Sequence, residues 1–471
     1  MLFTSVSFVY MFLPLVLLFY YFPFRKFRKV QHFFLFIVSL LFYAWEVPSY
    51  VLILLFSILM NYLFGILVDK FRSNELKSRM ILSVSIILNL GIIFYFKYLA
   101  FAVSNINAVF HKNIPVPEIM LPIGISFFTF QAISYVIDVY RNNGKVQKNP
   151  LNVGLYIAFF PQLVAGPIVR YESFSSQLEN RKESFATFSD GVIRFIRGLA
   201  KKILLANTLA AVADKAFSAS KDELSVSFAW LGILAYSFQI LFDFSGYSEM
   251  AIGLGKMFGF EFHENFNYPY ISKSISEFFR RWHISLGSWF RDYVYFPLGG
   301  SRVKTKSRLI LNLFVVWILT GLWHGANWTF IIWGILYFLL ISFEKLTGFN
   351  KSRRFKLLHH IYTILFVMIG WVFFRSADIS QALYYLKIMF FQSGNEIFDQ
   401  NTYIYFMENK FFFIAAFLCS TPIFLTLSSK WNLNEKRWNG VLYPILYILL
   451  FLVSMSYVIK GSYNPFIYFN F

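Results

Sequence analysis

Charged side chains are scarce in this sequence. Only 14% of its 471 residues are charged, with 24 acidic against 43 basic residues, whereas a soluble domain carries roughly 25% charged residues. So few charges cannot cover the surface of a water-soluble protein of this length, which excludes that class. Cysteine is nearly absent as well. Because Cys419 is the only cysteine, no disulfide can form within the chain, and a secreted disulfide-stabilised scaffold is excluded.

Apolar residues make up 58% of the chain and aromatic residues 22%, a composition that excludes disorder. The apolar residues fall into runs near the length of ~20 residues that a membrane helix needs, and we predict an all-α polytopic membrane protein with about 11–13 transmembrane or re-entrant helices. The first run has no basic segment before it, so we expect a retained helix. The candidate spans are Leu2–Phe22, Gln31–Trp45, Ser49–Val68, Met80–Val103, Leu121–Tyr140, Leu151–Val169, Gly191–Phe217, Ser225–Phe244, Leu309–Trp323, Trp328–Phe343, His359–Phe374, Phe411–Leu427 and Val441–Val458.

The net charge of +19 would suggest a nucleic acid partner in a soluble protein. Here the basic residues lie in short loops between apolar runs, which is the pattern that orients membrane helices. We therefore expect no nucleic acid partner, an N-terminus outside the membrane, and a basic cytoplasmic face suited to anionic membrane lipids or an anionic cofactor. The basic loops contain Arg25, Lys26, Arg28 and Lys29, then Lys70, Arg72, Lys77 and Arg79, then Arg141, Lys145 and Lys148, and later residues 351–356 and 430–437.

No repeat and no long polar linker divides the chain, which predicts a single membrane domain over residues 1–471. Residues 245–308 differ from the rest, because they mix aromatic and ionisable side chains. Such a segment cannot face lipid, so we expect it to line a protein cavity or to lie re-entrant at the cytoplasmic interface. Its ionisable residues include Arg280, Arg281, His283, Arg291, Asp292, Arg302 and Lys304.

Two histidines stand out against this apolar background. His324 lies between two apolar runs and is flanked by Gly321 and Gly325, which permit the close approach of a helix or a ligand. A neutral imidazole there can act as a general base, or it can simply hydrogen-bond a neighbouring helix. His283 follows the pair Arg280 and Arg281, so it is either a second histidine of a cavity or an interfacial residue of an amphipathic helix.

Further polar groups occupy apolar settings. Residues 159–170 contain Pro161, where we expect the helix to be broken. Asp243 and Tyr247 are candidates for substrate binding, although such groups also hold membrane helices together by hydrogen bonds. Asn327 follows His324 in the same polar turn and is a further binding candidate. No motif with metal-ligand spacing and no phosphate-binding loop occurs, so we predict no metal site and no ATP-driven pump.

Four internal segments and the C-terminus resemble the membrane-bound O-acyltransferase family, and in particular the bacterial membrane proteins of alginate and peptidoglycan O-acetylation. The D-alanyl transfer protein of teichoic acid is a more distant relative. The resemblance covers essentially the whole chain, and the pairing of an R-R-W-H with a W-H-G-A segment is specific. The matching segments are Phe160–Ile168, Phe242–Tyr247, Phe279–Leu286, Gly321–Ala326 and Pro465–Phe471.

The resemblance implies a function. It places the catalytic base on His324 and the second active-site histidine on His283, in a ring of helices around a central tunnel or funnel. The expected reaction moves an acetyl or acyl group from a cytoplasmic thioester, acetyl-CoA or a carrier-bound acyl group, to an extracytoplasmic polysaccharide. No cofactor is expected to be bound permanently. Candidate contacts for the donor phosphates are Arg280, Arg281, Arg291 and Lys304, although basic residues also serve as topology signals.

The resemblance further implies a bacterial cytoplasmic membrane and a partner outside it, either an SGNH or hydrolase-like acetyltransferase or the polysaccharide acceptor itself. Direct transfer and a covalent intermediate both remain open, as does the polymer that is acetylated. Two other classes of protein stay in contention. One is a transporter or flippase for an acyl group or a lipid-linked sugar, since buried histidines also serve proton relays. The other is a structural subunit of an export complex, in which His324 would be dispensable.

Overall fold

The computed structural model describes residues 1–24, 26–220, 223–349, 355–392, 394–430, 439–461 and 467. Throughout these ranges the regular structure is helical, with no strand. Seven helices are long and apolar enough to cross a membrane, and Phe8–Tyr21 and Ile125–Tyr140 are shorter apolar helices. The protein is therefore an all-helical, multi-pass membrane protein. The seven spans are Tyr50–Lys70, Glu75–Phe110, Val226–Met257, Lys306–His324, Trp328–Thr347, Lys356–Arg375 and Gly440–Ile459.

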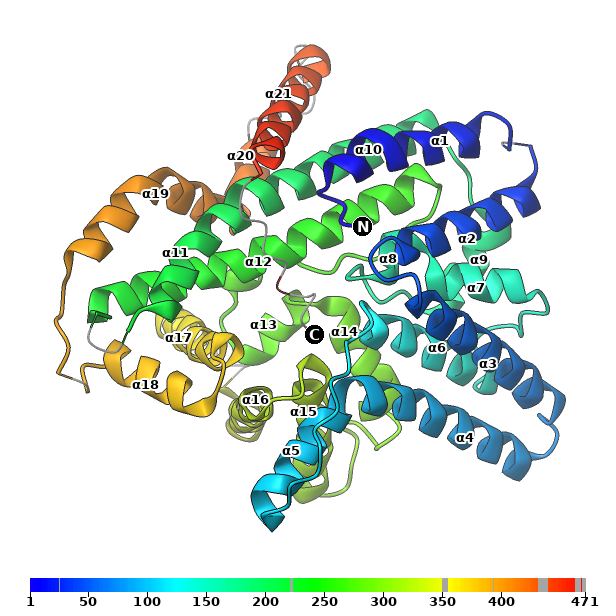
Figure 1. The fold of residues 1–471 in the computed structure, drawn as a ribbon, viewed down its shortest axis with the longest axis horizontal. Coiled ribbons are helices and arrows are strands. Elements are labelled where there is room, and N and C mark those ends of the chain that lie inside the picture. Colours follow the sequence, from blue (N-terminus) through cyan, green and yellow to red (C-terminus); the bar gives the residue numbers. More distant parts are fainter. Residues whose placement is uncertain are drawn as a thin grey trace. The chain divides into compact units, whose positions relative to one another are not determined.

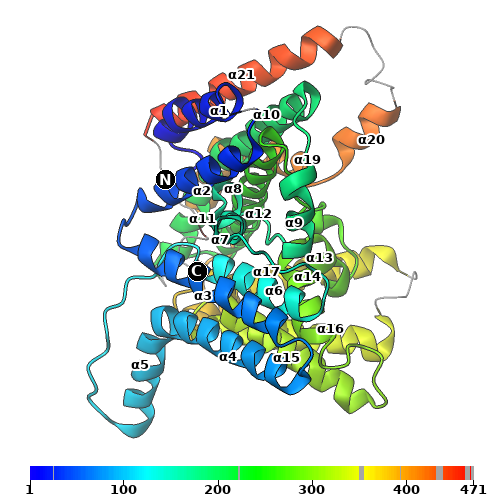
Figure 2. The same ribbon diagram turned by 90° about the vertical axis from the view of Figure 1, so that its right-hand side faces the viewer.

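The chain divides into two compact units, and the single domain expected from the sequence remains a prediction. The first unit contains residues 1–195 and 250–263. In it, α3, α4 and α6 pack on one another (Figure 2), and α2 packs on α7. Its elements are η1 (Phe8–Phe12), α1 (Leu13–Tyr21), α2 (Arg28–Ala44), α3 (Tyr50–Lys70), α4 (Glu75–Ile93), η2 (Phe94–Tyr98), α5 (Leu99–Phe110), α6 (Ile125–Tyr140), α7 (Pro150–Ala158), α8 (Phe160–Leu163), α9 (Tyr171–Asn180), most of α10 (Phe185–Ala200) and the end of α12.

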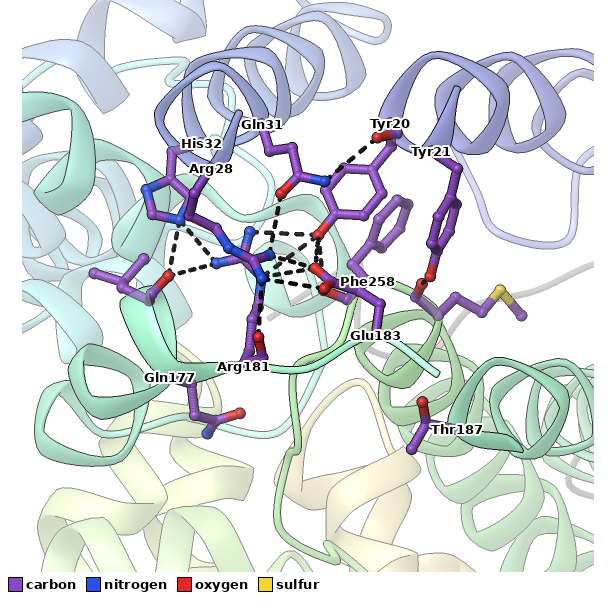
Figure 3. Close-up of polar contacts among 12 residues, drawn as sticks. Tyr20, Tyr21, Arg28, Gln31, His32, Gln177, Arg181, Glu183, Thr187 and Phe258 are labelled. Atoms are coloured by element: carbon purple, nitrogen blue, oxygen red, sulfur yellow. Dashed lines mark hydrogen bonds and ion pairs between the residues drawn. The ribbon is translucent and has the colours of Figure 1, made fainter. Parts of the chain in front are cut away.

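A charged network joins the helix ends of the first unit (Figure 3). Arg28 forms a bidentate ion pair with Glu183, whose Oε1 also accepts a hydrogen bond of 2.6 Å from the Tyr20 hydroxyl. Arg181 donates to the backbone oxygen of Leu178 and to His32 Nε2, both at 2.7 Å. Burial alone would raise the pKa of Glu183, but the hydrogen bonds from Arg28 and Tyr20 and the charges of Arg28 and Arg181 lower it below its usual value.

The second unit contains residues 196–249 and 264 onward. Its longest helix is α12, and η3 joins α10 to α11 as one continuous helix through a π-helical turn. Its elements are η3 (Lys201–Ala206), α11 (Asn207–Ser218), α12 (Val226–Met257), η4 (Pro269–Ile271), α13 (Ile275–Arg281), α14 (Ile284–Phe290), η5 (Arg291–Tyr295), α15 (Lys306–His324), α16 (Trp328–Thr347), α17 (Lys356–Arg375), α18 (Ile379–Met389), α19 (Gln400–Cys419), α20 (Ile423–Lys430) and α21 (Asn439–Ile459).

The helices α15 and α16 form the most extensive helix pair of the second unit and lie side by side in Figure 1. Two glycines allow this approach. A Cβ atom on Gly321 would come within 2.5 Å of the Phe330 carbonyl oxygen, and one on Gly334 within 2.6 Å of the Trp317 carbonyl oxygen. No side chain fits at either position, because real Cβ contacts are longer. The close pairing fixes the last turn of α15, which ends at His324.

The observed helices follow the predicted spans, with three differences. The break expected at Pro161 falls at Phe159, which separates α7 from α8 and has ψ 113°. The span predicted to end at Phe244 continues as α12 to Met257, so the distinct segment begins later than residue 245. The span predicted over residues 411–427 is divided between α19 and α20. The predictions made for Arg25 and for residues 351–354, 436–437, 465–466 and 468–471 lie outside the described residues.

Candidate active site

A cavity of about 460 Å³ in the second unit contains both singled-out histidines. His283 and His324 are each only 3% exposed and lie in its interior, whereas Arg280, Arg291 and Lys345 are exposed residues at its rim. The other lining residues are mostly apolar and include Phe279, Trp317 and Trp333. The cavity therefore combines exposed cations, apolar side chains and two buried histidines.

His324 is the last residue of α15. The rings of Trp333, Trp323 and Phe374 surround its imidazole, with centroid separations of 4.9, 5.0 and 5.1 Å. His324 is thus a buried imidazole that lines the cavity at the end of an apolar helix.

His283 lies between two short helices, α13 and α14. It adopts φ 45° and ψ 55°, in the left-handed region that residues other than glycine rarely occupy, and it directly precedes α14. This backbone conformation turns the chain between the two helices. Phe244 packs edge-on against the imidazole at a centroid separation of 4.5 Å, and Trp323 lies against both histidines.

Burial also decides the charge of His283. It lowers the pKa of His283 to about 3, because an imidazolium in this apolar setting loses its hydration. With its pKa lowered in this way, the side chain is neutral at physiological pH. A neutral imidazole has one protonated and one unprotonated ring nitrogen.

The entrance combines cations from three elements. Arg280 comes from α13, Arg291 from the start of η5 and Lys345 from α16. The Arg291 guanidinium also contacts the Asp292 carboxylate at 2.8 Å, and Lys345 Nζ donates to the Tyr295 hydroxyl at 3.2 Å. Lys345 was not predicted, because a lysine in the last turn of an apolar helix is the ordinary pattern of a membrane-helix end.

Glu344 fixes the position of α13 and was also not predicted. Its buried carboxylate accepts hydrogen bonds from the backbone N–H groups of Ile275 at 2.5 Å and Ser276 at 2.9 Å. These groups belong to the first turn of α13, where N–H groups have no partner within the helix. Glu344 thereby ties α16 to the short helix that leads into His283.

The remaining predicted residues lie away from this cavity. Arg281 pairs with Glu277 at 2.9 Å, although the neighbouring Arg280 lines the cavity. Lys304 is exposed in the loop before α15, and Asn327 caps α16 and donates to the Ala377 carbonyl oxygen at 2.8 Å. None of these three belongs to the cavity wall.

Asp243 and Tyr247 are buried on α12 and likewise lie outside the cavity wall. Asp243 forms an ion pair with Lys202 at 2.6 Å, and its second oxygen accepts the backbone N–H of Ile467 at 2.9 Å. This arrangement matches the alternative in which Asp243 holds helices together. A buried pair of this kind stabilises the fold only while both partners are present.

Across the described ranges, no group of three or more histidine, cysteine, aspartate or glutamate side chains could hold a metal ion. The cavity instead offers the features that an elongated anionic substrate requires. Its cations suit phosphate groups, its apolar side chains suit an uncharged arm, and its histidines suit proton transfer.

Fold and cavity together define a class of protein, a multi-pass helical membrane protein with two buried histidines at the end of a cationic cavity. The sequence model of the membrane-bound O-acyltransferase family (MBOAT) matches residues 145–387, about half of the chain, and this stretch includes both histidines. The chain belongs to this family and is an acyltransferase.

Two relatives are similar over the full length of this chain, and a third over about half of it. The chain is 37% identical to a probable alginate O-acetylase AlgI of Pseudomonas putida, with 100% of both chains covered. It is 32% identical to a peptidoglycan O-acetyltransferase of Helicobacter pylori, over 100% of this chain and 98% of the other. It is also 32% identical to a teichoic acid D-alanyltransferase of Bacillus subtilis, over 53% of this chain and 66% of the relative.

Proposed function

We propose that this protein transfers an acetyl group from a cytoplasmic thioester across the membrane, for O-acetylation of a polysaccharide outside the cytoplasm. The observation that carries the proposal is the cavity in which His283 and His324 lie behind Arg280, Arg291 and Lys345. Relatives named for acetylating alginate and peptidoglycan support an acetyl donor and a polysaccharide pathway.

The donor enters at the cationic rim. Acetyl-CoA carries phosphates at one end and its thioester at the other, joined by an uncharged pantetheine arm. Arg280, Arg291 and Lys345 contact the phosphates, and the arm lies along the apolar side chains of the cavity. A carrier protein would present the same arm through a single phosphate. The two donors therefore differ mainly in how many of the rim cations contact phosphate.

His324 acts as the general base. It removes the proton of an acceptor hydroxyl, whose oxygen attacks the thioester carbonyl carbon. The carbon–sulfur bond then breaks, and the thiolate leaves as a free thiol after taking the proton from the His324 imidazolium. His283 holds the thioester in place. A positioned base of this kind contributes roughly 10²–10⁴-fold to a rate.

The location and the partners belong to the same proposal. The protein lies in the bacterial cytoplasmic membrane with its N-terminus outside, and its basic loops face the cytoplasm and the anionic membrane lipids. The acetyl group passes to an SGNH or hydrolase-like transferase outside the cytoplasm or directly to the polymer. Similarity to both alginate and peptidoglycan O-acetylating relatives supports an acceptor of this class.

The experiment uses the purified protein in nanodiscs with acetyl-CoA labelled in the acetyl group. We expect release of free CoA together with transfer of label to a hydroxyl acceptor or to water. In His324→Ala, neither the release of CoA nor the transfer of label should exceed background. A transporter or flippase would bind or move its cargo with the carbon–sulfur bond intact. A wild-type protein that cleaves neither acetyl-CoA nor a carrier-bound acetyl thioester would therefore contradict the proposal.

A further inference from the structure

The side chain of Asn265, in the loop after α12, contacts His283. Asn265 is buried at 1% exposure, and its Oδ1 lies 3.2 Å from His283 Nδ1. The same oxygen accepts the backbone N–H of Ser285 at 3.1 Å and the Ser285 hydroxyl at 2.9 Å. The Asn265 amide nitrogen donates to the Ser248 hydroxyl at 3.0 Å.

These contacts determine the orientation of the amide. A backbone N–H can only donate, so the Asn265 atom that faces Ser285 must be the oxygen. An amide oxygen can only accept, and the Ser285 hydroxyl, which also lies 3.5 Å from His283 Nδ1, gives its single proton to that oxygen. His283 Nδ1 must therefore carry a proton to make its bond with Asn265. The neutral imidazole has one proton, and its Nε2 therefore bears a lone pair.

The lone pair restricts what His283 can bind. A neutral His283 with an unprotonated Nε2 cannot donate a hydrogen bond to a carbonyl oxygen, so it cannot polarise the thioester from that atom. It can only accept a hydrogen bond from an N–H or an O–H. The reacting hydroxyl of the acceptor gives its proton to His324 in the proposed mechanism. On the thioester itself, the hydrogen-bond donor nearest the reacting carbonyl is the amide N–H of the pantetheine arm.

We propose that Asn265 is a positioning residue that holds His283 in the tautomer protonated on Nδ1, so that His283 Nε2 accepts a hydrogen bond from the amide N–H nearest the sulfur of a pantetheine thioester. This inference rests on the proposed function. The amide is two methylene groups from the sulfur, which places the contact beside the reacting carbonyl. It is common to acetyl-CoA and to carrier-bound thioesters, so it does not depend on which of them is the donor.

The charged groups that surround His283 lie on α12, α13, η5, α15 and α16 and in the loop after α12. Burial is the one cause of its lowered pKa. On α12, Asp243 and Glu249 are paired with Lys202 and Lys201. The other titratable or charged groups of the surrounding elements are Glu264 in the loop, Glu277, Arg280 and Arg281 on α13, Arg291 and Asp292 on η5, His324 on α15, and Glu344 and Lys345 on α16.

The first test compares two short thioesters, S-acetyl-N-acetylcysteamine and its analogue with an ester oxygen in place of the amide N–H. For the wild type we expect kcat/KM to be roughly three- to tenfold higher with the amide, as for one hydrogen bond. In His283→Ala the preference should vanish. Equal rates for both thioesters in the wild type would overturn the inference while leaving the proposed function intact. Failure to cleave either thioester or acetyl-CoA would instead contradict the proposed function.

The second test uses Asn265→Asp, which keeps an oxygen in front of His283. The added carboxylate, in direct contact with the ring, should raise the pKa of His283 towards its ordinary value, because it favours the imidazolium. Below the raised pKa, Nε2 gains a proton and can no longer accept. The amide preference of this variant should therefore fall as pH is lowered from 8 to 5, more than in the wild type.

Asn267→Asp is the matched control, since it adds the same charge two residues further on at an exposed side chain. Its preference should follow that of the wild type. An amide preference in Asn265→Asp that tracks the wild type across the whole pH range would overturn the role of Asn265, because a purely structural asparagine would change rates equally for both thioesters.

Discussion

Arg181 in the first unit is buried, as His324 is in the second, yet their surroundings differ. The Arg181 guanidinium donates hydrogen bonds to protein partners (Figure 3), namely Tyr20, His32 and the Leu178 carbonyl oxygen. It also lies over the Phe260 ring at 4.4 Å. His324 instead lines a cavity among aromatic rings, and His283 lines the same cavity.

The difference separates two uses of costly buried polar groups. A buried charge whose hydrogen bonds are all made to protein groups holds helices together. Removing one of its partners strongly destabilises the fold. A histidine that lines a cavity can contact a substrate. Because His283 is neutral, it adds no fixed charge to the buried part of that cavity. Burial and ionisable character alone therefore do not identify a site, whereas access to a cavity does.

The largest effect on stability is expected at Glu183. Glu183→Gln removes the charge that balances Arg28 and Arg181. Breaking a buried pair costs about 3–5 kcal/mol, and we expect the lower end, roughly 3 kcal/mol, since Arg28 is a third exposed. Thermal unfolding in nanodiscs measures this loss, while kcat per folded molecule should stay at the wild-type value.

The same residue predicts a pH dependence. The pKa of Glu183 is lower in the folded state than in the unfolded state. Its contribution to stability is therefore fully present above the ordinary glutamate value of ~4.3, and it is lost as pH falls through the folded pKa. Unfolding temperatures should reveal this as a decline in acid that Glu183→Gln lacks. A Glu183→Gln protein with wild-type stability and reduced kcat would break the comparison.

A smaller effect is expected at the entrance of the cavity. Arg291→Gln and Lys345→Gln should each raise KM for acetyl-CoA by roughly fivefold with little change in kcat, because a phosphate contact is made in both the ground and the transition state. Steady-state kinetics should show no such change for Lys304→Gln, which removes an exposed charge away from the cavity. If all three variants keep the wild-type KM for acetyl-CoA, the donor enters elsewhere.

The smallest effect is expected at Glu344. Glu344→Gln keeps one acceptor oxygen for the two N–H groups of Ile275 and Ser276 and loses the other. One hydrogen bond is worth about 1 kcal/mol. Its loss lets α13 shift and move His283, and we expect kcat to fall by about fivefold at most. Glu277→Gln is the control. It weakens the ion pair with Arg281 and changes the acceptor of the Lys273 backbone N–H, but it leaves the two bonds to Glu344 in place and should keep the wild-type kcat.

The helices and both histidines could be predicted from the sequence, because apolar runs and isolated ionisable groups are local signals. Arg280 and Arg281 show where such reasoning ends. Successive residues on a helix point about 100° apart, so only one of the two can face a given cavity, and the sequence does not say which side of α13 is covered. The structure selects Arg280.

Asn265 and Glu344 could not be predicted for a different reason. Asn265 contacts a histidine 18 residues later, and Glu344 binds backbone groups 68 and 69 residues earlier. Both act through long-range hydrogen bonds to groups that have no signature of their own. The ion-pair partner of Asp243 could not be predicted either, since Lys202 lies on another helix earlier in the chain.

The most direct test compares two buried histidines, one from each polar cluster. His324→Ala and His32→Ala are measured side by side in nanodiscs for release of CoA from acetyl-CoA and for thermal unfolding. We predict that His324→Ala loses roughly 10²–10⁴-fold in kcat at an unchanged unfolding temperature. His32→Ala should unfold at a lower temperature, because Arg181 loses a partner, while it keeps kcat. Near-normal CoA release by a folded His324→Ala protein would contradict the assignment of this cavity as the active site.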